Sequence, residues 1–332
     1  MNTTTNQQPA ESQPAPRRRL IPRLSNSGAL HTLLGSSKAR IGFVIVMIFI
    51  LAAIFAPLIA PGNPTKFVGA TNKPPSAQFI LGTNPQGKNV FAQLIWGGQI
   101  SLLIGFGSAF LMTLIATIIG MIAGYYRGVV DDVLNFLMNL FLVIPALPLL
   151  VLLSAYLKPG TATIIFALAI TGWAYNARII RAQTLSLREK DFVAAAVVSG
   201  EPSLKVIFVH ILPNMVNIIV GGFIGAVIYG IMASTALAFL GLASTQDVTW
   251  GTNLFWAQNG GALMIGAWWA FVPSGLAVAL VAFGLALINY GMDEITNPRL
   301  RAETLVKKLG RNLLSGHVRS TPVVPRSHEP LG

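Results

Sequence analysis

The chain has few charged residues and no cysteine. Only 10% of its 332 residues are charged, whereas a soluble globular domain carries roughly 25%. Without cysteine, the sequence can form no disulfide, no thiolate metal site and no cysteine nucleophile. Hydrophobic residues make up 53% of the chain, so the shortage of charge indicates a protein that lies in lipid.

Several long stretches contain no charged residue at all. A hydrocarbon core about 30 Å thick requires roughly 20 apolar helical residues to cross it. Six stretches pass this test and predict an all-α membrane protein with six transmembrane helices, at about residues 41–60, 99–124, 133–156, 160–177, 215–240 and 268–290. The first exceeds the roughly 7 to 15 residues of a signal-peptide core, so we interpret it as an uncleaved span.

The net charge of +12 is distributed unevenly along these spans. If the N-terminus is cytoplasmic, 19 Lys and Arg lie on the inner side, and the outer side holds Lys66, Lys73, Lys88 and Lys158. This asymmetry follows the positive-inside rule and predicts that both termini are cytoplasmic. It also accounts for the basic charge without a nucleic-acid partner, and we expect the lipid bilayer to be the partner instead.

One outer segment has the spacing of a nucleotide-binding loop. GTNPQGKN, residues 82–89, follows a possible strand, AQFIL, and contains G-x-x-x-x-G-K. The next position is Asn89, which has no hydroxyl to hold magnesium, and the predicted topology places the segment outside the cell. The stretch around it, residues 61–90, is rich in proline and glycine and predicts an ordered or semi-ordered outer loop. We therefore do not predict nucleotide binding here.

The sequence contains none of the common catalytic motifs that we looked for. Neither HExxH nor G-x-S-x-G occurs, and the four histidines are far apart: His31, His210, His317 and His328. We therefore expect no catalytic residue, no metal site and no cofactor in this chain. The predicted spans also lack the buried acids and bases that ion-coupled carriers usually have.

The spans contain mild polar residues, glycine pairs and prolines. Four asparagines are expected to bridge helices or to touch water in a central path: Asn135, Asn139, Asn176 and Asn289. Two glycine pairs have the spacing of close helix packing: Gly120 with Gly124, and Gly221 with Gly225. Three prolines predict bends, because proline cannot complete the helical hydrogen bonds: Pro145, Pro148 and Pro273.

The segment between the fourth and fifth predicted spans contains helix boundary signals. Ser186 followed by Glu189 has the spacing of a capping box, so we predict that a short helix begins there. Gly200 most readily adopts the left-handed conformation that ends a helix. Pro202 suits a first helical position and would open a second short helix that runs to about Val209. Two short helices and a sharp bend are therefore predicted, with Pro213 at the start of the fifth span.

This segment resembles a known family signature. The letters DFVAAAVVSGEPSLKVIFVHILPN resemble the EAA signature of importer-type ATP-binding-cassette permeases, matched at Ala195, Ala196, Gly200, Leu212 and Pro213. Further stretches match in order over roughly residues 35–302: FAPLIAP, LGTNPQGKNV, SLLIG, AR at 177–178, SLREKDFVAAA, HILPN, FLGL and NPRLR. Together they are similar to the dipeptide and oligopeptide permease family, in particular to its C-type subunit.

The resemblance implies a fold, partners and a contact site. It implies the MetI-like architecture of type I importers in a bacterial or archaeal cell membrane. It also implies a second homologous permease, two ATPase subunits that bind ATP and magnesium, and an extracytoplasmic solute-binding protein. The ATPase contact would comprise Ala194, Ala195, Ala196, Gly200, Glu201, Pro202, Ser203, Leu212 and Pro213. The family's opening glutamate is Ala194 here, which leaves Glu189, Asp191 or Glu201 as possible substitutes.

The chain is accordingly divided into four parts. Residues 1–37 are predicted to be a mostly disordered cytoplasmic tail, 38–97 the first span and outer loop, 98–292 the permease core with a coupling loop at 182–213, and 293–332 a second tail. The predicted function is a permease subunit of an ATP-driven, binding-protein-dependent importer of dipeptides or oligopeptides. Oligosaccharides are an alternative cargo, and an ion-coupled carrier or a non-transporting scaffold are alternatives of other classes.

Overall fold

Five helices of the computed structural model are long and apolar enough to cross a membrane. They are α2 (Ser37–Ile54), α4 (Val90–Tyr126), α7 (Thr161–Arg188), α10 (Val216–Phe239) and α12 (Trp268–Thr296). The structure describes residues 36–296, and nearly all of the two predicted tails, with the NPRLR stretch, lies outside this range. Five predicted spans coincide with these helices, although α4 starts earlier than residue 99 and α7 continues well beyond 177.

The third predicted span is not one continuous helix. It consists of α5 (Gly128–Val143) and α6 (Ala146–Tyr156), which meet at 87°. Ile144 is extended because the ring of Pro145 disfavours a helical conformation in the preceding residue. The bend predicted at Pro145 is therefore confirmed, and α5 with α6 makes a sixth candidate span if the bent pair is counted as one. Pro148 lies in the first turn of α6 and Pro273 lies inside α12, and both helices continue past them.

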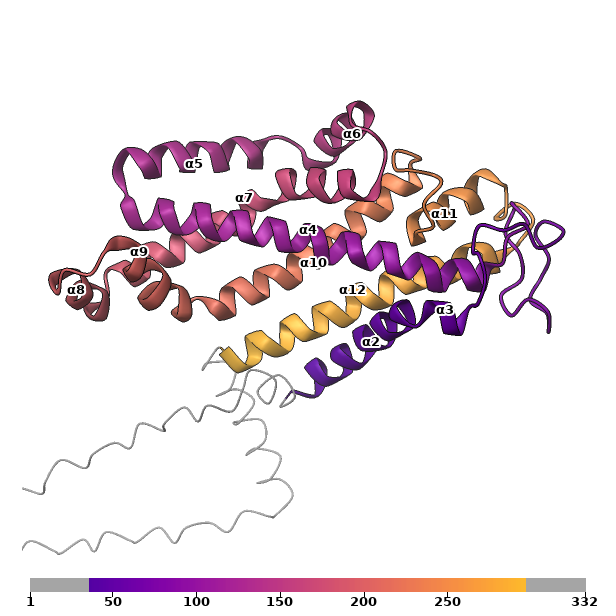
Figure 1. Cartoon of the computed structure of the whole chain (residues 1–332), viewed down its shortest axis with the longest axis horizontal. Helices are drawn as coiled ribbons and strands as arrows, with labels where there is room; N and C mark the ends of the chain where they lie inside the picture. The colour runs from indigo at the N-terminus through magenta and orange to yellow at the C-terminus, as the bar shows by residue number, and fades with distance from the viewer. Residues whose placement is uncertain (1–35, 297–332) are drawn as a thin grey trace, which may run out of the picture.

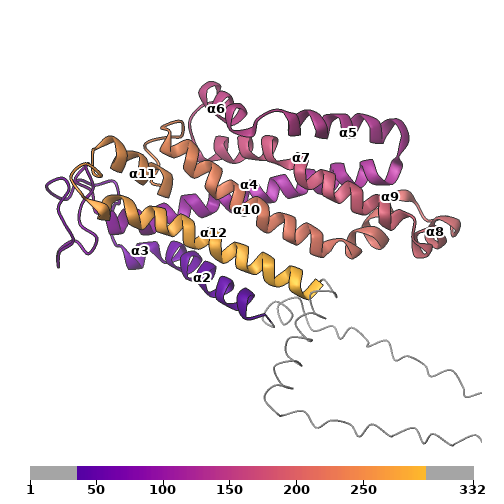
Figure 2. The same cartoon turned by 180° about the vertical axis from the view of Figure 1, so that it is seen from behind.

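The helices lie in an elongated bundle with different elements at its two ends. Figures 1 and 2 show α2 beside α12 along one edge, α5 and α6 along the opposite edge, and α4, α7 and α10 between them. One end carries α8 (Asp191–Val198) and α9 (Ser203–Lys205). The other end carries α3 (Ala56–Ile59), the loop of residues 60–89 and α11 (Trp250–Asn259). We call the latter group, residues 56–89 and 250–267, the cap.

Glycines allow α4 to pack tightly along α7. A Cβ atom on Gly120 would lie 2.6 Å from the Ala177 carbonyl oxygen, and one on Gly124 would lie 2.6 Å from the Thr184 Cβ. Backbone approach this close is possible only without side chains on these two residues. The prediction for the Gly120 and Gly124 pair is therefore confirmed.

The cap is ordered by hydrogen bonds to the ends of the long helices. The indole of Trp96 donates to the Ala60 carbonyl over 2.9 Å, and that of Trp269 donates to the Thr83 carbonyl over 3.2 Å. The possible strand AQFIL is not formed, and the described residues contain only two isolated bridges, Phe67 with Lys88 and Thr83 with Asn89.

The loop with nucleotide-binding spacing has its own internal partners. Asn84 Oδ1 accepts hydrogen bonds from the backbone amides of Gln86 and Lys88, both over 2.9 Å, and Asn89 caps the N-terminus of α4. Burial lowers the pKa of the Lys88 ammonium below its ordinary value. Backbone amides that a phosphate would need are therefore already satisfied by an asparagine side chain, as expected for a structural turn.

Candidate functional site

A bent segment that we call the elbow, residues 189–214, projects from one end of the bundle. After α7 ends at Arg188, α8 runs from Asp191 to Val198 and the chain turns at Gly200. Gly200 has φ of +79°, in the left-handed region that favours glycine, so the prediction of a bend at this residue is confirmed. The chain then forms one helical stretch from Ser203 to Asn214 that leads directly into α10.

The predicted capping box at the start of the elbow is wrong. Ser186 lies inside the last turn of α7, and Glu189 follows its end. The helix persists because Thr184 is fully buried against Gly124 of α4, so packing holds the last turns of α7 in place. The short helix α8 begins instead after Lys190, with Asp191 in its first turn, where a carboxylate suits the helix dipole.

The helix after the bend also differs from its prediction. Pro202 is the extended N-cap residue and Ser203 the first helical one. The helix does not stop near Val209: it is wound as a π helix, η1 (Val206–Ile211), and then as a 3₁₀ turn, η2 (Leu212–Asn214). Pro213 lies within that 3₁₀ turn, just before α10 begins. The second half of the elbow is therefore a continuous extension of α10.

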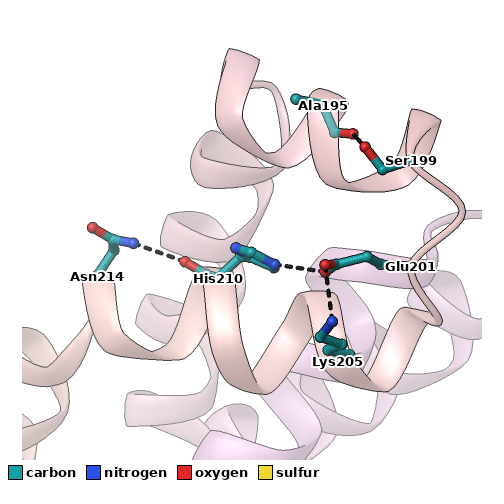
Figure 3. A network of polar contacts seen from close by, with 6 residues as sticks. All are labelled: Ala195, Ser199, Glu201, Lys205, His210 and Asn214. Carbon is teal, nitrogen blue, oxygen red and sulfur yellow. Dashed lines mark hydrogen bonds and ion pairs between the residues drawn. The ribbon is translucent and has the colours of Figure 1, made fainter.

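Glu201 ties the bend to the helix that follows it. Its carboxylate accepts a hydrogen bond from Lys205 Nζ over 3.0 Å and lies 2.6 Å from His210 Nε2, as Figure 3 shows. Further along the same helix, the Asn214 amide donates to the His210 carbonyl over 2.7 Å. The hydrogen bond from Lys205, followed by that from His210, holds the pKa of the Glu201 carboxyl below its usual range.

The Glu201 contacts predict a pH dependence of the elbow. A carboxyl with a lowered pKa stabilises the folded state above its ordinary pKa, and this contribution is lost as the pH falls through the lowered value. In the purified protein, Glu201→Gln should speed amide hydrogen exchange in residues 201–214 at pH 7. The ratio of variant to wild-type exchange should fall toward one as the pH drops below the ordinary glutamate pKa and through the lowered value. Glu189→Gln is the control, and a ratio that stays constant with pH would contradict this role.

The elbow has a buried side and an exposed apolar side. Val193, Ala196 and Ile207 are buried, and they pack in a cluster with residues of α4 and α7. The opposite surface, which we call the elbow face, exposes large apolar side chains: Phe192, Val197, Val198, Leu204, Phe208 and Val209. Sequence reasoning missed this face, although apolar residues in a segment too short to span a membrane are a signal for it. Exposed apolar surface of this kind marks a contact with protein or with the membrane.

The predicted contact residues are distributed over both sides of the elbow. Of the three alanines, Ala194 and Ala195 are exposed and Ala196 is buried. The other predicted contacts are exposed, namely Gly200, Pro202 and Pro213, or partly exposed, namely Glu201, Ser203 and Leu212.

The three acids near Ala194 have different surroundings. Glu189 pairs with Arg127, at the turn between α4 and α5, and Glu201 pairs within the elbow. Asp191 has no ion pair among residues 36–296. Asp191 lies three residues before Ala194 on α8, and both residues are exposed.

A cavity of about 690 Å³ opens between α4, α7, α10, α12 and the break between α5 and α6. None of its lining residues is charged, and most are apolar. Its polar lining includes Thr113, Asn176, Asn217 and Asn289. Of the four asparagines predicted for a central path, Asn176 and Asn289 therefore line it. Asn139 instead accepts a hydrogen bond from Arg178 over 3.1 Å, and Asn135 lies outside the lining.

The second glycine pair lines this cavity, and its two members differ in how closely a neighbouring helix approaches them. No atom lies within 4 Å of a Cβ built on Gly225, and the nearest to one on Gly221 is Asn289 Oδ1 at 3.3 Å. The prediction that this pair permits close helix packing is therefore confirmed at Gly221, where a Cβ would crowd Asn289 of α12, and wrong at Gly225. Glycine spacing alone does not distinguish a packed helix surface from the wall of a cavity.

Comparison with known proteins places the chain in a family. The family described as binding-protein-dependent transport system inner membrane component matches residues 116–302, and the N-terminal transmembrane domain of oligopeptide transport permease C matches residues 28–75. A Brucella suis protein named for a peptide transport system permease is 34% identical over 266 residues, which are 80% of this chain and 88% of that protein.

Two further relatives have similar coverage. The oligopeptide transport system permease protein OppC of Bacillus subtilis is 33% identical over 267 residues, 79% of this chain and 86% of the relative. The dipeptide transport system permease protein DppC of Alkalihalophilus pseudofirmus is 31% identical over 283 residues, 82% of this chain and 90% of the relative. The chain therefore belongs to the binding-protein-dependent transport system inner membrane components, and within them to the permeases of the dipeptide and oligopeptide type.

Proposed function

We propose that this chain is a permease subunit of an ATP-driven importer of dipeptides or oligopeptides. It would act with a second homologous permease, two ATPase subunits that bind ATP and magnesium, and an extracytoplasmic solute-binding protein. The peptide cargo is supported by the names of the relatives, which are peptide, oligopeptide and dipeptide permeases. The observation that carries the mechanism is the continuity of the elbow with α10, whose first turns line the cavity.

The elbow would be the contact with the ATPase. Its buried side fixes it to α4 and α7, so a force on the elbow face passes into the bundle and does not merely move a loop. Most of the predicted contact residues are exposed or partly exposed on the elbow, with Ala194 and Ala195 on α8 and Pro202 and Ser203 after the bend. Closure of the ATPases would then shift the start of α10 and change access to the cavity.

The charge distribution supports an elbow that lies in the cytoplasm, with both termini on the same side. The elbow end of the bundle carries five basic residues, Arg127, Arg181, Arg188, Lys190 and Lys205, whereas the cap carries three, Lys66, Lys73 and Lys88. Positive residues concentrate on the cytoplasmic side of membrane proteins. The cap would then face the solute-binding protein outside a bacterial or archaeal cell.

Purification and reconstitution of the complex test this function. The tagged chain, expressed with its neighbouring subunits, should retain an ATPase and a second permease through purification. In proteoliposomes with the solute-binding protein, it should take up labelled trialanine only when ATP is supplied on the ATPase side. A proton ionophore should leave the rate unchanged at constant ATP. Uptake by this chain alone, or uptake that the ionophore stops, would contradict the proposal in favour of an ion-coupled carrier.

A further inference from the structure

The segment that joins α11 to α12 exposes an apolar surface at the cap end of the bundle. Leu263, Ile265 and Trp268 are each more than half exposed, and Met264 is 94% exposed. We call residues 260–268 the apolar turn, and Figure 1 shows the segment between α11 and α12 at the end opposite the elbow. Within the apolar turn, only Trp268 has a side chain with an N–H or O–H group. Water is an unfavourable neighbour for such a surface, so its exposure needs an explanation.

The fold holds the apolar turn in a defined shape. Gly261 and Gly266, with φ of +67° and +69°, lie on either side of residues 263–265. A Cβ atom on either glycine would meet no described atom within 4 Å, so glycine is required there by the left-handed backbone and not by packing. Ala262 and Ala267 are fully buried and pack in a cluster with residues of α11 and α12. The apolar side chains are therefore presented outward by a fixed framework.

The backbone of the apolar turn satisfies most of its own hydrogen bonds. Seven of its nine amides donate to carbonyl oxygens of residues 256–266, and among the described residues only the amides of Leu263 and Ile265 lack a backbone partner. In the cap loop, by contrast, fewer than half of the amides of residues 61–81 have a partner in the described part of the chain. Water satisfies an unpaired amide, but lipid does not. The pairing therefore suits a segment that lies outside water.

The surroundings of the apolar turn favour lipid over protein as its neighbour. The sequence has no charged residue from 248 to 292, a range that contains α11, the apolar turn and the candidate span Trp268–Met292. Protein interfaces have a polar rim and about one hydrogen bond per 100–200 Å², whereas the side chains of the apolar turn offer a single indole N–H. Trp268 and Trp269 open the span, and tryptophans are enriched where a span meets the membrane surface.

We propose that the apolar turn is a membrane anchor, in which Leu263, Met264 and Ile265 insert into the leaflet at the cap end and Trp268 lies at the level of the lipid head groups. The partner is the bilayer itself and no particular head group, because the turn has no charged side chain. The anchor continues the lipid contact of α12 and holds the start of that helix, together with α11, at the membrane surface. This contact does not depend on which solute the complex imports.

Nitroxide labels measure what surrounds the turn, because the chain has no cysteine of its own. The chain is purified with its partner subunits and placed in lipid nanodiscs, with the wild-type complex as the background. Labelled Met264→Cys is compared with labelled Thr71→Cys, an exposed position in the cap loop. Oxygen concentrates in lipid, and a nickel chelate stays in water. The ratio of oxygen to nickel collisions should be roughly fivefold higher, or more, at residue 264 than at residue 71.

Other neighbours of the turn give different results, and each of these results would overturn the anchor. Equal ratios at residues 264 and 71 would place the turn in water. Low collision rates with both reagents at residue 264 would show that a protein subunit covers it. Addition of the solute-binding protein should leave the rates at residue 264 unchanged, and a fall in oxygen collisions there would identify that protein as the partner.

A charge in the turn tests whether lipid holds it in place. Met264→Asp should move the turn out of the leaflet, because a carboxylate is unfavourable in hydrocarbon, and nickel collisions at a label on Ile265→Cys should rise at least threefold. Met264→Ser, a milder change, should raise them by a smaller factor, and Thr71→Asp should leave them unchanged. Recovery of the complex with its normal subunits checks assembly. Unchanged nickel collisions at residue 265 in both Met264 variants would show that lipid does not hold the turn and would overturn the anchor.

Discussion

Replacing Gly200 with valine is expected to abolish ATP-driven uptake while the chain remains inserted in the membrane. The left-handed conformation at this residue, with φ of +79°, is unfavourable for a residue with a Cβ by about 1–2 kcal/mol, and β-branching adds to this. No atom lies within 4 Å of a Cβ built there, so the strain acts on the backbone of the bend and not on packing. The bend would open and move α8 away from the helix of residues 203–214.

Matched glycines separate the bend from general effects of substitution. Gly69 is also in open space but lacks the left-handed conformation, so Gly69→Val should retain uptake. Gly200→Asn should retain part of it, because asparagine tolerates the left-handed region better than valine. The measurements are trialanine uptake in proteoliposomes and the amount of each variant in the membrane. Unimpaired uptake by Gly200→Val would contradict the proposal that the elbow takes part in transport.

Arg181→Leu is expected to lower the free energy of unfolding, because it breaks an ion pair at the elbow end of the bundle. Arg181 Nε and Nη2 donate to the two carboxylate oxygens of Asp131 over 2.5 and 2.7 Å and join α7 to α5. The side chains are only 22% and 13% exposed. Removal of Arg181 leaves the partly buried carboxylate of Asp131 without its partner. We therefore expect the free energy of unfolding to fall by about 2 kcal/mol, between the values for exposed and fully buried pairs.

An exposed pair at the same end serves as the control. Arg127 pairs with Glu189, but these side chains are 45% and 64% exposed, so Arg127→Leu should lower the free energy of unfolding by less than about 1 kcal/mol. Denaturant unfolding in detergent measures both. The double variant Asp131→Leu/Arg181→Leu should be less destabilised than Arg181→Leu, because no lone charge remains. If Arg181→Leu and Arg127→Leu lowered the free energy of unfolding equally, burial would not be what makes the Arg181 pair more important.

The sequence predicted features that depend on one residue's backbone and missed those that depend on tertiary contacts. The turn at Gly200 follows from the left-handed preference of glycine, and the break at Pro145 from the missing amide and the restricted Ile144. The size of that break, 87°, depends on how α6 packs over α7 and α10, which no local pattern contains.

The failed predictions have the same origin. The Ser186 and Glu189 pair has a capping spacing, yet the burial of Thr184 extends α7 through it. Glu201 was one of three acids considered as a substitute for the family glutamate at Ala194. Its position in the sequence does not reveal that its carboxylate pairs with Lys205 and His210. Helix positions were therefore predictable, while their ends and their faces were set by neighbours distant in sequence.

The π-helical winding of Val206–Ile211 has a consequence for the helix that follows it. Each hydrogen bond of a π helix spans one residue more than in an α helix, so this segment contains one residue more than an α-helical turn would need. If the elbow rewinds it as an α helix, everything beyond it turns by about 100° about its axis. Asn217 and Gly221 would then rotate away from the space they border, and the bundle would present different side chains to a passing molecule while every long helix stayed intact.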